Sequence, residues 1–199
     1  VENILRKFFM CGFAGFFGGK LATNRELADT TLEAMAEEII TRGPDSSGLW
    51  CMANDAVGMS HRRLSILDLS PAGHQPMLSQ SRRYTIAFNG EIYNHLELRE
   101  KLGKDFGPMI WKGSSDTETL LACIDNWGVH KTLSNLVGMF AFSLWDNVSK
   151  ILTLSRDRVG EKPLYYGWQG SGIDKVFLFG SDLKSFKAYP NFNPVVDRN

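Results

Sequence analysis

The sequence predicts one α+β domain in which helices pack on mostly antiparallel sheets, in two layers or in four. Its 199 residues suit a single domain, and its shares of hydrophobic residues (43%) and charged residues (22%) are those of a globular protein with a full core. Short apolar runs that favour strands recur along the chain and are joined by short turns, which favours antiparallel pairing. A few segments between them have the apolar spacing of amphipathic helices.

The first expected element is a buried strand within residues 8–19, which read FFMCGFAGFFGG. Small and large residues alternate there, so that a neighbouring backbone can approach closely. Arg6 and Lys7 before an apolar run also resemble a secretion signal. Glycines interrupt that run, however, and no small-x-small cleavage site follows before Lys20, so the buried strand is favoured.

A helix follows over residues 24–40, where apolar side chains recur at helical spacing. Thr23 or Asn24 is expected to cap its start, and Gly43-Pro44 ends it. Short strands are then predicted over residues 49–52, 57–60 and 64–67.

The next strand covers residues 84–88 and is expected to end at Asn89-Gly90, a strong tight-turn signal. A short helix fits residues 95–102, with Gly103 behind it.

A longer helix fits residues 117–127, with a cap within residues 114–116 and Gly128 at its end. Strands dominate after it, over residues 139–145, 151–155, 164–168 and 176–180. From about Tyr189 the pattern becomes irregular.

Charge and cysteine content exclude several classes of protein. Lys+Arg and Asp+Glu both number 22, so the balance favours neither a nucleic-acid surface nor an acidic tail. The three cysteines, Cys11, Cys51 and Cys123, are far apart and form no CxxC pair, which argues against a disulfide framework and a zinc site and favours a reducing compartment. No apolar run approaches the roughly 20 residues that span a bilayer.

Five stretches hold more polar and glycine residues than core packing requires. They are RGPDSSG (42–48), HRRLSILD (61–68), FNGEIYN (88–94), GSSDTE (113–118) and RDRVGEKPLYYG (156–167). Each has an ordinary structural interpretation. RGPD suits a turn across which Arg42 and Asp45 pair, Asn-Gly suits a hairpin turn, SSD suits a helix cap, and Arg63 alone suits a surface charge.

Taken together and in this order after Cys11-Gly12, these motifs resemble the class II, N-terminal-nucleophile glutamine amidotransferase domains. They are most similar to the amino-terminal domain of glutamine-hydrolysing asparagine synthetases, and the resemblance covers roughly residues 10–199. It implies an Ntn-type four-layer αββα sandwich. It also implies hydrolysis of L-glutamine to glutamate and ammonia, with Cys11 as the nucleophile and its own α-amino group as the base.

An α-amine with a pKa of about 7.7–8.0 is suited to that role, so none of the four histidines is required as a base. A Cys/His pair stays open as an alternative, and His61 is its first candidate because it lies two residues from Arg63. The resemblance assigns the oxyanion hole to Asn89 and Gly90, whose amide groups are hydrogen-bond donors. It assigns the substrate α-carboxylate to Arg63 and the α-ammonium to Asp116.

The same pocket is expected to be lined by the acidic residue after the Asn-Gly pair and by the segment after the arginine, namely Glu91, Leu64, Ser65, Ile66 and Leu67. Arg42 and Asp45 are expected to support the site from behind. Arg156, Asp157 and Lys162 fit the same supporting group or a contact with a following domain. No metal site is expected.

The resemblance also predicts domain boundaries. Residues 1–10 are expected to be a leader, either a misassigned start before Met10 or a propeptide, because with them attached Cys11 has no free amine. The third alternative is that they persist and the domain is inactive. The amidotransferase domain is expected over residues 11–188, and residues 189–199 as the start of a linker to an absent synthetase domain.

The ammonia is expected to pass to that carboxyl-terminal synthetase domain in cis, in a cytoplasmic enzyme. ATP and magnesium belong to that domain and no cofactor to this one. Two alternatives remain, an amidotransferase for another acceptor, such as a sugar or polysaccharide precursor, and a non-catalytic glutamine-binding module. No nucleic-acid or membrane partner is expected, and a homodimer is left open.

Overall fold

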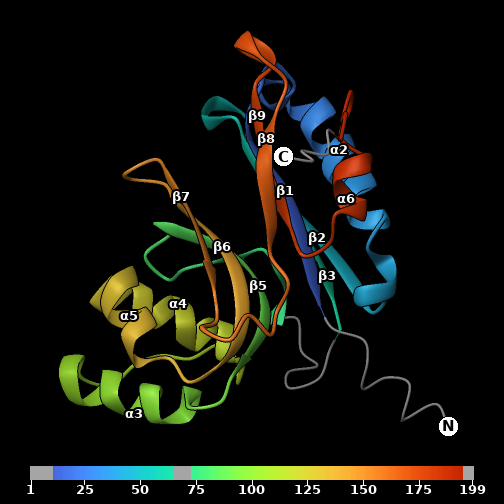
Figure 1. The fold of residues 1–199 in the computed structure, drawn as a ribbon. Helices are drawn as coiled ribbons and strands as arrows, with labels where there is room; N and C mark the ends of the chain where they lie inside the picture. Colours follow the sequence, from blue (N-terminus) through green and yellow to red (C-terminus); the bar gives the residue numbers. More distant parts are fainter. Residues whose placement is uncertain (1–10, 65–72, 195–199) are drawn as a thin grey trace, which may run out of the picture.

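Two antiparallel sheets packed face to face form the centre of the molecule, and helices cover both outer faces (Figure 1). The computed structural model describes residues 11–64 and 73–194. In those ranges the five-stranded sheet has the order β2-β3-β1-β9-β8 and the four-stranded sheet has the order β4-β5-β6-β7. The layers are therefore helix, sheet, sheet and helix, and the four-layer αββα prediction is confirmed.

The five-stranded sheet pairs the first strand of the chain with strands from both ends of the domain. Its strands are β2 (Ser46–Met52), β3 (Val57–Arg63), β1 (Gly12–Gly18), β9 (Val176–Gly180) and β8 (Tyr165–Gln169). Helices α2 (Arg25–Glu37) and α6 (Lys184–Lys187) cover its outer face. The predicted cap of α2 is confirmed, because the Asn24 side chain accepts a hydrogen bond from the N–H of Leu27 at 3.2 Å.

The four-stranded sheet carries the remaining helices on its outer face. Its strands are β4 (Met77–Leu78), β5 (Tyr84–Ile92), β6 (Gly138–Asp146) and β7 (Ile151–Arg156). Its helices are α3 (His95–Phe106), α4 (Asp116–Trp127) and α5 (Val129–Asn135). Ser115 caps α4 by accepting a hydrogen bond from the N–H of Glu118 at 3.2 Å, as the SSD motif predicts.

Side chains along β1 alternate between two apolar layers. Phe13 lies between the sheets, whereas Ala14 and Phe16 pack toward α2. A Cβ added to Gly15 would lie 2.5 Å from the Phe179 ring and 2.4 Å from the carbonyl oxygen of Gly58. Only glycine therefore lets these neighbours approach β1 so closely, as the alternation of small and large residues predicts.

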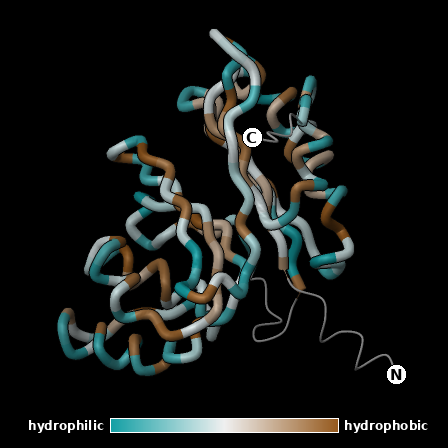
Figure 2. The backbone as a smooth tube through the Cα atoms, viewed as in Figure 1, coloured by the Kyte–Doolittle hydropathy of each residue, from teal (hydrophilic) through white to brown (hydrophobic). Residues whose placement is uncertain are grey.

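A third apolar layer joins the four-stranded sheet to its helices. Ile86 and Phe88 of β5 pack there against Leu98 of α3 and Leu120 of α4. In Figure 2, hydrophobic and hydrophilic bands alternate along these helices, as expected where one face packs on a sheet and the other meets solvent. The two outer cores and the inter-sheet core hold the sandwich together, so that strand ends from both sheets meet at fixed positions.

Several sequence-based boundaries are wrong. Helix α2 ends at Glu37 and not at residue 40, β2 begins three residues before its predicted start, and β3 ends three residues after its predicted end. β5 does not end in a turn at Asn89-Gly90 but continues to Ile92, because both residues pair with β6. Helix α3 does not end at Gly103 but continues to Phe106, and Gly107, with φ of 88°, follows it. Helix α5 and strand β4 were not predicted. The strand predicted over residues 64–67 lies outside the described residues except for Leu64.

The end of the described chain packs on the five-stranded sheet. Tyr189 is buried, and its ring meets that of Phe16 edge-on, with centroids 5.9 Å apart. Phe192 contacts Phe186 of α6 in the same manner. The domain boundary at residue 188 and the linker stay predictions. In the described ranges, no helix combines the length and the apolar character that crossing a membrane requires.

Candidate functional site

The start of β1 and the end of β3 bring Cys11 beside Leu64. The two strands are antiparallel, with Gly12 opposite Arg62, so Cys11, directly before β1, lies beside the end of β3 at Arg63 and next to Leu64. The N–H of Leu64 donates a hydrogen bond to the Cys11 sulfur at 3.2 Å, and that sulfur lies 3.5 Å from the Leu64 carbonyl oxygen. The backbone thus fixes the thiol at one end of the sandwich.

The surroundings of this thiol keep it protonated. Burial raises the pKa of Cys11 above its usual value, and the nearby charge of Asp116 adds to that effect. The hydrogen bond from Leu64 and the positive charge of Arg63 oppose it but do not outweigh it. A thiol of this kind needs a base before it can attack an amide.

Strand β5 directs Asn89 into the space between the sheets. Ala87 belongs to the inter-sheet core, and residues two apart on a strand share a face, so Asn89 faces the same way. Its side chain is 1% exposed, and its Nδ2 atom has no hydrogen-bond partner among the described residues. Buried amide donors are rarely left unpaired, so the Asn89 amide is free to donate a hydrogen bond to a bound ligand.

The backbone N–H of Gly90 lies on the edge of β5 that faces away from β6. On that edge the N–H of Phe88 bonds the side chain of Gln75 at 2.7 Å, and the N–H of Ile92 bonds Asp116 at 2.9 Å. Strand β4 pairs only with the earlier part of β5 and has ended before Gly90. The side-chain amide of one residue and the backbone amide of the next therefore lie at neighbouring positions, although the strand makes no turn there.

Close packing explains the glycine at this position. A Cβ on Gly90 would lie 2.3 Å from the carbonyl oxygen of Met139 in β6. No larger residue fits without moving the strand.

Arg63 and Asp116 place opposite charges near the thiol. Arg63 ends β3 and shares the inter-sheet face with Met59. Its guanidinium packs against Gly73, since a Cβ added to Gly73 would lie only 2.1 Å from Nη2 of Arg63. Asp116 begins α4, is 6% exposed, and has a pKa raised chiefly by burial despite hydrogen bonds from Ile92 and Thr117. Because both charges shift the pKa of Cys11, both lie within electrostatic reach of the sulfur.

The RGPD segment braces both strands that hold the thiol. The Nε atom of Arg42 donates to the carbonyl oxygen of Cys11 at 3.4 Å, and its Nη2 atom is buried without a partner in the described part of the chain. Gly43 packs so closely that a Cβ would lie 2.4 Å from the Arg62 carbonyl oxygen. The N–H of Asp45 donates to the carbonyl oxygen of Arg63 at 3.1 Å, while its side chain is exposed.

The loop after β7 brings Lys162 to the same region. Asp157 accepts hydrogen bonds from the N–H groups of Glu161 and Lys162, and Arg156 donates to the Lys162 carbonyl oxygen at 2.6 Å. Lys162 is 4% exposed. Burial and the charge of Arg42 lower the pKa of Lys162, whereas the thiol of Cys11 opposes the change, so these three groups are neighbours.

The remaining predicted residues divide into two sets. Glu91 is half-buried, and its charge raises the pKa of Asp116. Ser65, Ile66 and Leu67 lie outside the described residues. Among residues 11–64 and 73–194, no group of three or more His, Cys, Asp or Glu side chains is placed to hold a metal ion.

His61, the first candidate for an alternative base, and Gln75, which no motif singled out, both bond the backbone of Phe88 directly before Asn89. His61 is fully buried, its Nε2 atom lies 2.9 Å from the Phe88 carbonyl oxygen, and burial lowers its pKa to about 4. The ring is therefore neutral at ordinary pH, and Nε2 carries the proton that the carbonyl accepts. Nε2 is thus not available as a base for Cys11, and the buried Nδ1, which has no hydrogen-bond partner among the described residues, is a weak base at neutral pH because the ring has this low pKa.

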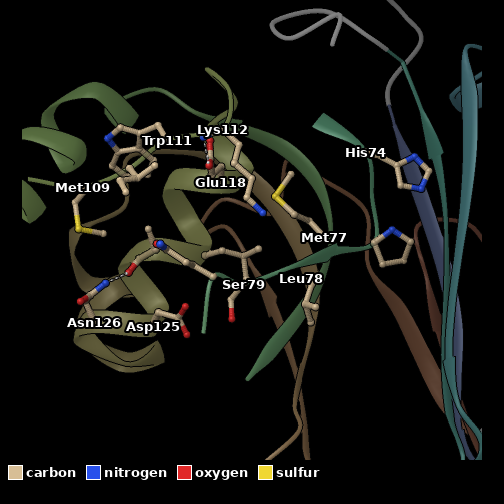
Figure 3. A pocket seen from close by; sticks show the side chains of 15 residues that line it. His74, Met77, Leu78, Ser79, Met109, Trp111, Lys112, Glu118, Asp125 and Asn126 are labelled. Atoms are coloured by element: carbon tan, nitrogen blue, oxygen red, sulfur yellow. Dashed lines mark hydrogen bonds between the residues drawn. The ribbon is translucent and has the colours of Figure 1, made fainter. Parts of the chain in front are cut away.

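A separate cavity of about 350 Å³ lies beside α4, β4 and residues 109–112 (Figure 3). Its lining includes Met77, Trp111, Lys112 and Asp125, and among the described residues it contains neither a cysteine nor any candidate site residue. The lining also includes Ser79, whose hydroxyl accepts a hydrogen bond from the N–H of Tyr84. The cavity thus offers no nucleophile paired with a base.

Comparisons with known proteins agree with the fold and the motifs. A family model described as a glutamine amidotransferase domain matches residues 10–199. Asparagine synthetase [glutamine-hydrolyzing] 3 of Bacillus subtilis is 37% identical over 194 residues, which cover 95% of this chain and 29% of that protein. The synthetase numbered 1 of the same organism is 38% identical, with 92% and 27% covered. Amidase chry2 of Gibberella zeae is 34% identical, with 90% and 27% covered.

A solved structure, glutamine phosphoribosylpyrophosphate amidotransferase from B. subtilis, superposes with a TM-score of 0.69 over 89% of this chain and 43% of that one. Its sequence identity is 20%, so the likeness is one of fold, and it confirms the predicted Ntn-type sandwich. The chain spans less than a third of the curated relatives named above. Since the family model matches nearly all of its residues, this chain belongs to the glutamine amidotransferase domain family.

Proposed function

We propose that this domain hydrolyses L-glutamine to L-glutamate and ammonia through a thioester on Cys11. The observation that carries the proposal is the buried, unpartnered Nδ2 of Asn89 beside the N–H of Gly90. Two amide donors aimed at one place stabilise the oxyanion of a tetrahedral intermediate.

The chemistry requires the thiol proton to move before attack. In a chain that begins at Cys11, the α-amine takes this proton, because its pKa lies near neutral pH and it is attached to the same residue. The sulfur then bonds to the side-chain carbonyl carbon of glutamine, and the oxygen gains the negative charge that Asn89 and Gly90 stabilise. The carbon–nitrogen bond breaks, and the amine returns the proton to the departing nitrogen, which leaves as ammonia. Water then cleaves the thioester, which releases glutamate and restores the thiol.

Arg63 and Asp116 would hold the substrate during these steps. The planar guanidinium of Arg63 suits a bidentate contact with the α-carboxylate, and the carboxylate of Asp116 suits the α-ammonium. Their opposite charges act on the same sulfur, which supports a single substrate placed between them. Fixing both charged ends holds the side-chain amide against the nucleophile.

The ammonia would serve a synthetase region of a longer protein. The B. subtilis relatives are named glutamine-hydrolysing asparagine synthetases, and this chain covers less than a third of each. ATP and magnesium belong to that region in this proposal. The G. zeae relative is named an amidase, so an acceptor other than aspartate is the second candidate.

Substitution of the three cysteines tests the nucleophile. Cys11→Ala should abolish ammonia release from glutamine, whereas Cys51→Ala and Cys123→Ala, which change buried core residues, should retain it. A glutamine analogue with an electrophilic carbon should label Cys11 alone. Labelling of Cys51 in the folded protein, or full activity of Cys11→Ala, would overturn the proposal.

A further inference from the structure

The backbone of Phe88 in β5 is held by side chains where its neighbouring strand is missing. Strand β4 pairs only with Ile86 and Thr85 of β5. Beyond it, the N–H of Phe88 donates to Oε1 of Gln75 at 2.7 Å, and the carbonyl oxygen of Phe88 accepts from Nε2 of His61 at 2.9 Å. Two buried side chains thus replace a strand directly before Asn89.

We propose that His61 and Gln75 are positioning residues that hold the oxyanion donors of Asn89 and Gly90 opposite Cys11. This inference rests on the glutaminase function proposed above. Both side chains are buried, with 1% of His61 and 6% of Gln75 exposed, and neither contacts the Cys11 sulfur through a hydrogen bond in the described part of the chain. They act through the backbone of Phe88.

His61 connects the two sheets at this point. It lies on β3, opposite Phe13 of β1, and Phe13 is two residues from Cys11. Its hydrogen bond ends on β5 of the other sheet. The link therefore fixes the strand that holds the nucleophile relative to the strand that holds the donors.

Gln75 connects the donors to the predicted substrate clamp. Its Nε2 atom donates to Oγ1 of Thr117 at 3.4 Å, and Thr117 follows Asp116 at the start of α4. Asp116 in turn accepts from the N–H of Ile92 at 2.9 Å. The segment from Phe88 to Ile92 is thus held at both ends, with the two donors between.

The test uses variants that remove or keep each donor. His61→Leu removes the link, and His61→Gln keeps an N–H at nearly the same distance from the backbone. Gln75→Met removes both of its hydrogen bonds at similar volume. Ser79→Ala is the matched control, because the Ser79 hydroxyl accepts from the N–H of Tyr84 at the far end of the same strand. Each variant is first checked by thermal melting and by alkylation of Cys11.

Glutaminase kcat and KM, and inhibition by an aldehyde analogue of glutamine that forms an oxyanion on Cys11, are then measured. His61→Leu and Gln75→Met should lower kcat by about 10- to 100-fold, because a small displacement of catalytic groups costs that much, with KM changed less. The aldehyde should bind more weakly by the same factor, since it mimics the transition state. His61→Gln should recover most of the loss, and Ser79→Ala should retain the parental kcat.

A double variant separates positioning from general support. In an Asn89→Ala background, removing His61 should cost less than it does in the parent, because part of what it positions is already gone. Equal costs in both backgrounds, or a fall in kcat for Ser79→Ala as large as that for His61→Leu, would overturn the inference. An active parent with fully active His61→Leu would also overturn it while leaving the glutaminase proposal intact. An inactive parent beginning at Cys11 would overturn the glutaminase proposal itself.

Discussion

At the scale of single residues, the unpartnered amide of Asn89 is the clearest sign of chemistry in this fold. A buried donor without an acceptor costs about 1–3 kcal/mol of stability in the resting protein. An oxyanion that forms beside it removes that cost in the transition state, so the donor stabilises the transition state more than the ground state.

Asn89→Ala should therefore lower turnover by about 10²- to 10³-fold, with a smaller change in KM. The melting temperature should stay the same or rise, since the substitution removes an unsatisfied buried group. Steady-state kinetics and a thermal melt check both parts. Asn126→Ala, which removes an exposed amide on α4, is the control. Unchanged turnover would leave Asn89 as an ordinary strand residue.

Arg63 and its neighbour Arg62 form a matched pair for testing the carboxylate contact. Arg63→Lys should raise the KM for glutamine by about 10- to 100-fold, because lysine keeps the charge but loses the bidentate geometry. Arg62 faces α2, where its Nε atom donates to the Ala36 carbonyl oxygen, so Arg62→Lys should leave KM unchanged. Equal KM values for the two variants would remove Arg63 from the substrate site.

The burial of Asp116 predicts a pH dependence of substrate binding. Its carboxyl has a raised pKa, chiefly because it is buried, and only the ionised form attracts the α-ammonium of glutamine. Affinity should be full above that pKa and should fall as pH decreases through it, starting at a higher pH than for an exposed aspartate. Asp116→Asn should show a high KM that no longer varies over this range. A parental KM that is flat down to pH 4 would contradict the assignment.

At the scale of elements, strand and helix positions follow from the sequence, whereas their ends depend on distant partners. Asn89-Gly90 is a turn signal by local rules, but Asn89 pairs with Ala141 and Gly90 with Phe140, and this pairing extends β5. Gly103 was expected to follow the helix, but α3 continues through it, because the helix packs its apolar face on the sheet.

Two glycines of these elements should respond oppositely to alanine. A Cβ on Gly103 of α3 meets no atom within 4 Å, so Gly103→Ala should stabilise the fold by about 0.5–1 kcal/mol and raise the melting temperature by about 1–4 °C. A Cβ on Gly90 would lie 2.3 Å from the Met139 carbonyl oxygen, so Gly90→Ala should lower the melting temperature and reduce turnover. Calorimetry of both variants decides the matter. A destabilising Gly103→Ala would show that the glycine there has another role.

At the scale of the whole molecule, the motifs point to residues whose proposed roles belong to their own side chains. Cys11, Arg63, Asn89 and Asp116 carry recognisable chemistry in recognisable order, and the structure brings them to one end of the sandwich. His61 was predicted only as an alternative base, and Gln75 was not predicted at all, because both bond the backbone of Phe88, and a backbone group leaves no signature in a sequence. His61 meets Phe88 only when the two sheets pack face to face, and Gln75 meets it only when the chain before β4 runs beside β5.

The placement of the thiol leads to a prediction about the whole chain. The sulfur of Cys11 stays protonated because it is buried, and the neutral His61 ring donates a hydrogen bond to the Phe88 carbonyl oxygen. Since burial lowers the pKa of His61 to about 4, its remaining nitrogen, Nδ1, is a weak base at neutral pH, and the α-amine of Cys11 is the better candidate. When residues 1–10 are attached, that nitrogen is part of a peptide bond and has no basic lone pair. A protein that begins at Val1 should therefore be inactive, and one that begins at Cys11 should release ammonia from glutamine.

Both forms are prepared, their amino termini are verified by intact mass before and after the assay, and ammonia release is measured at several pH values. The form that begins at Cys11 should gain activity as pH rises to about 7.7–8.0, the usual range for an α-amine, and the nearby cations Arg42 and Lys162 favour the neutral amine. Cleavage of the longer form to the shorter during incubation should restore activity in proportion to the mass of Cys11-terminated protein. Full activity of a longer form that stays uncleaved would refute the α-amine as base and would transfer that role to a side chain of the site.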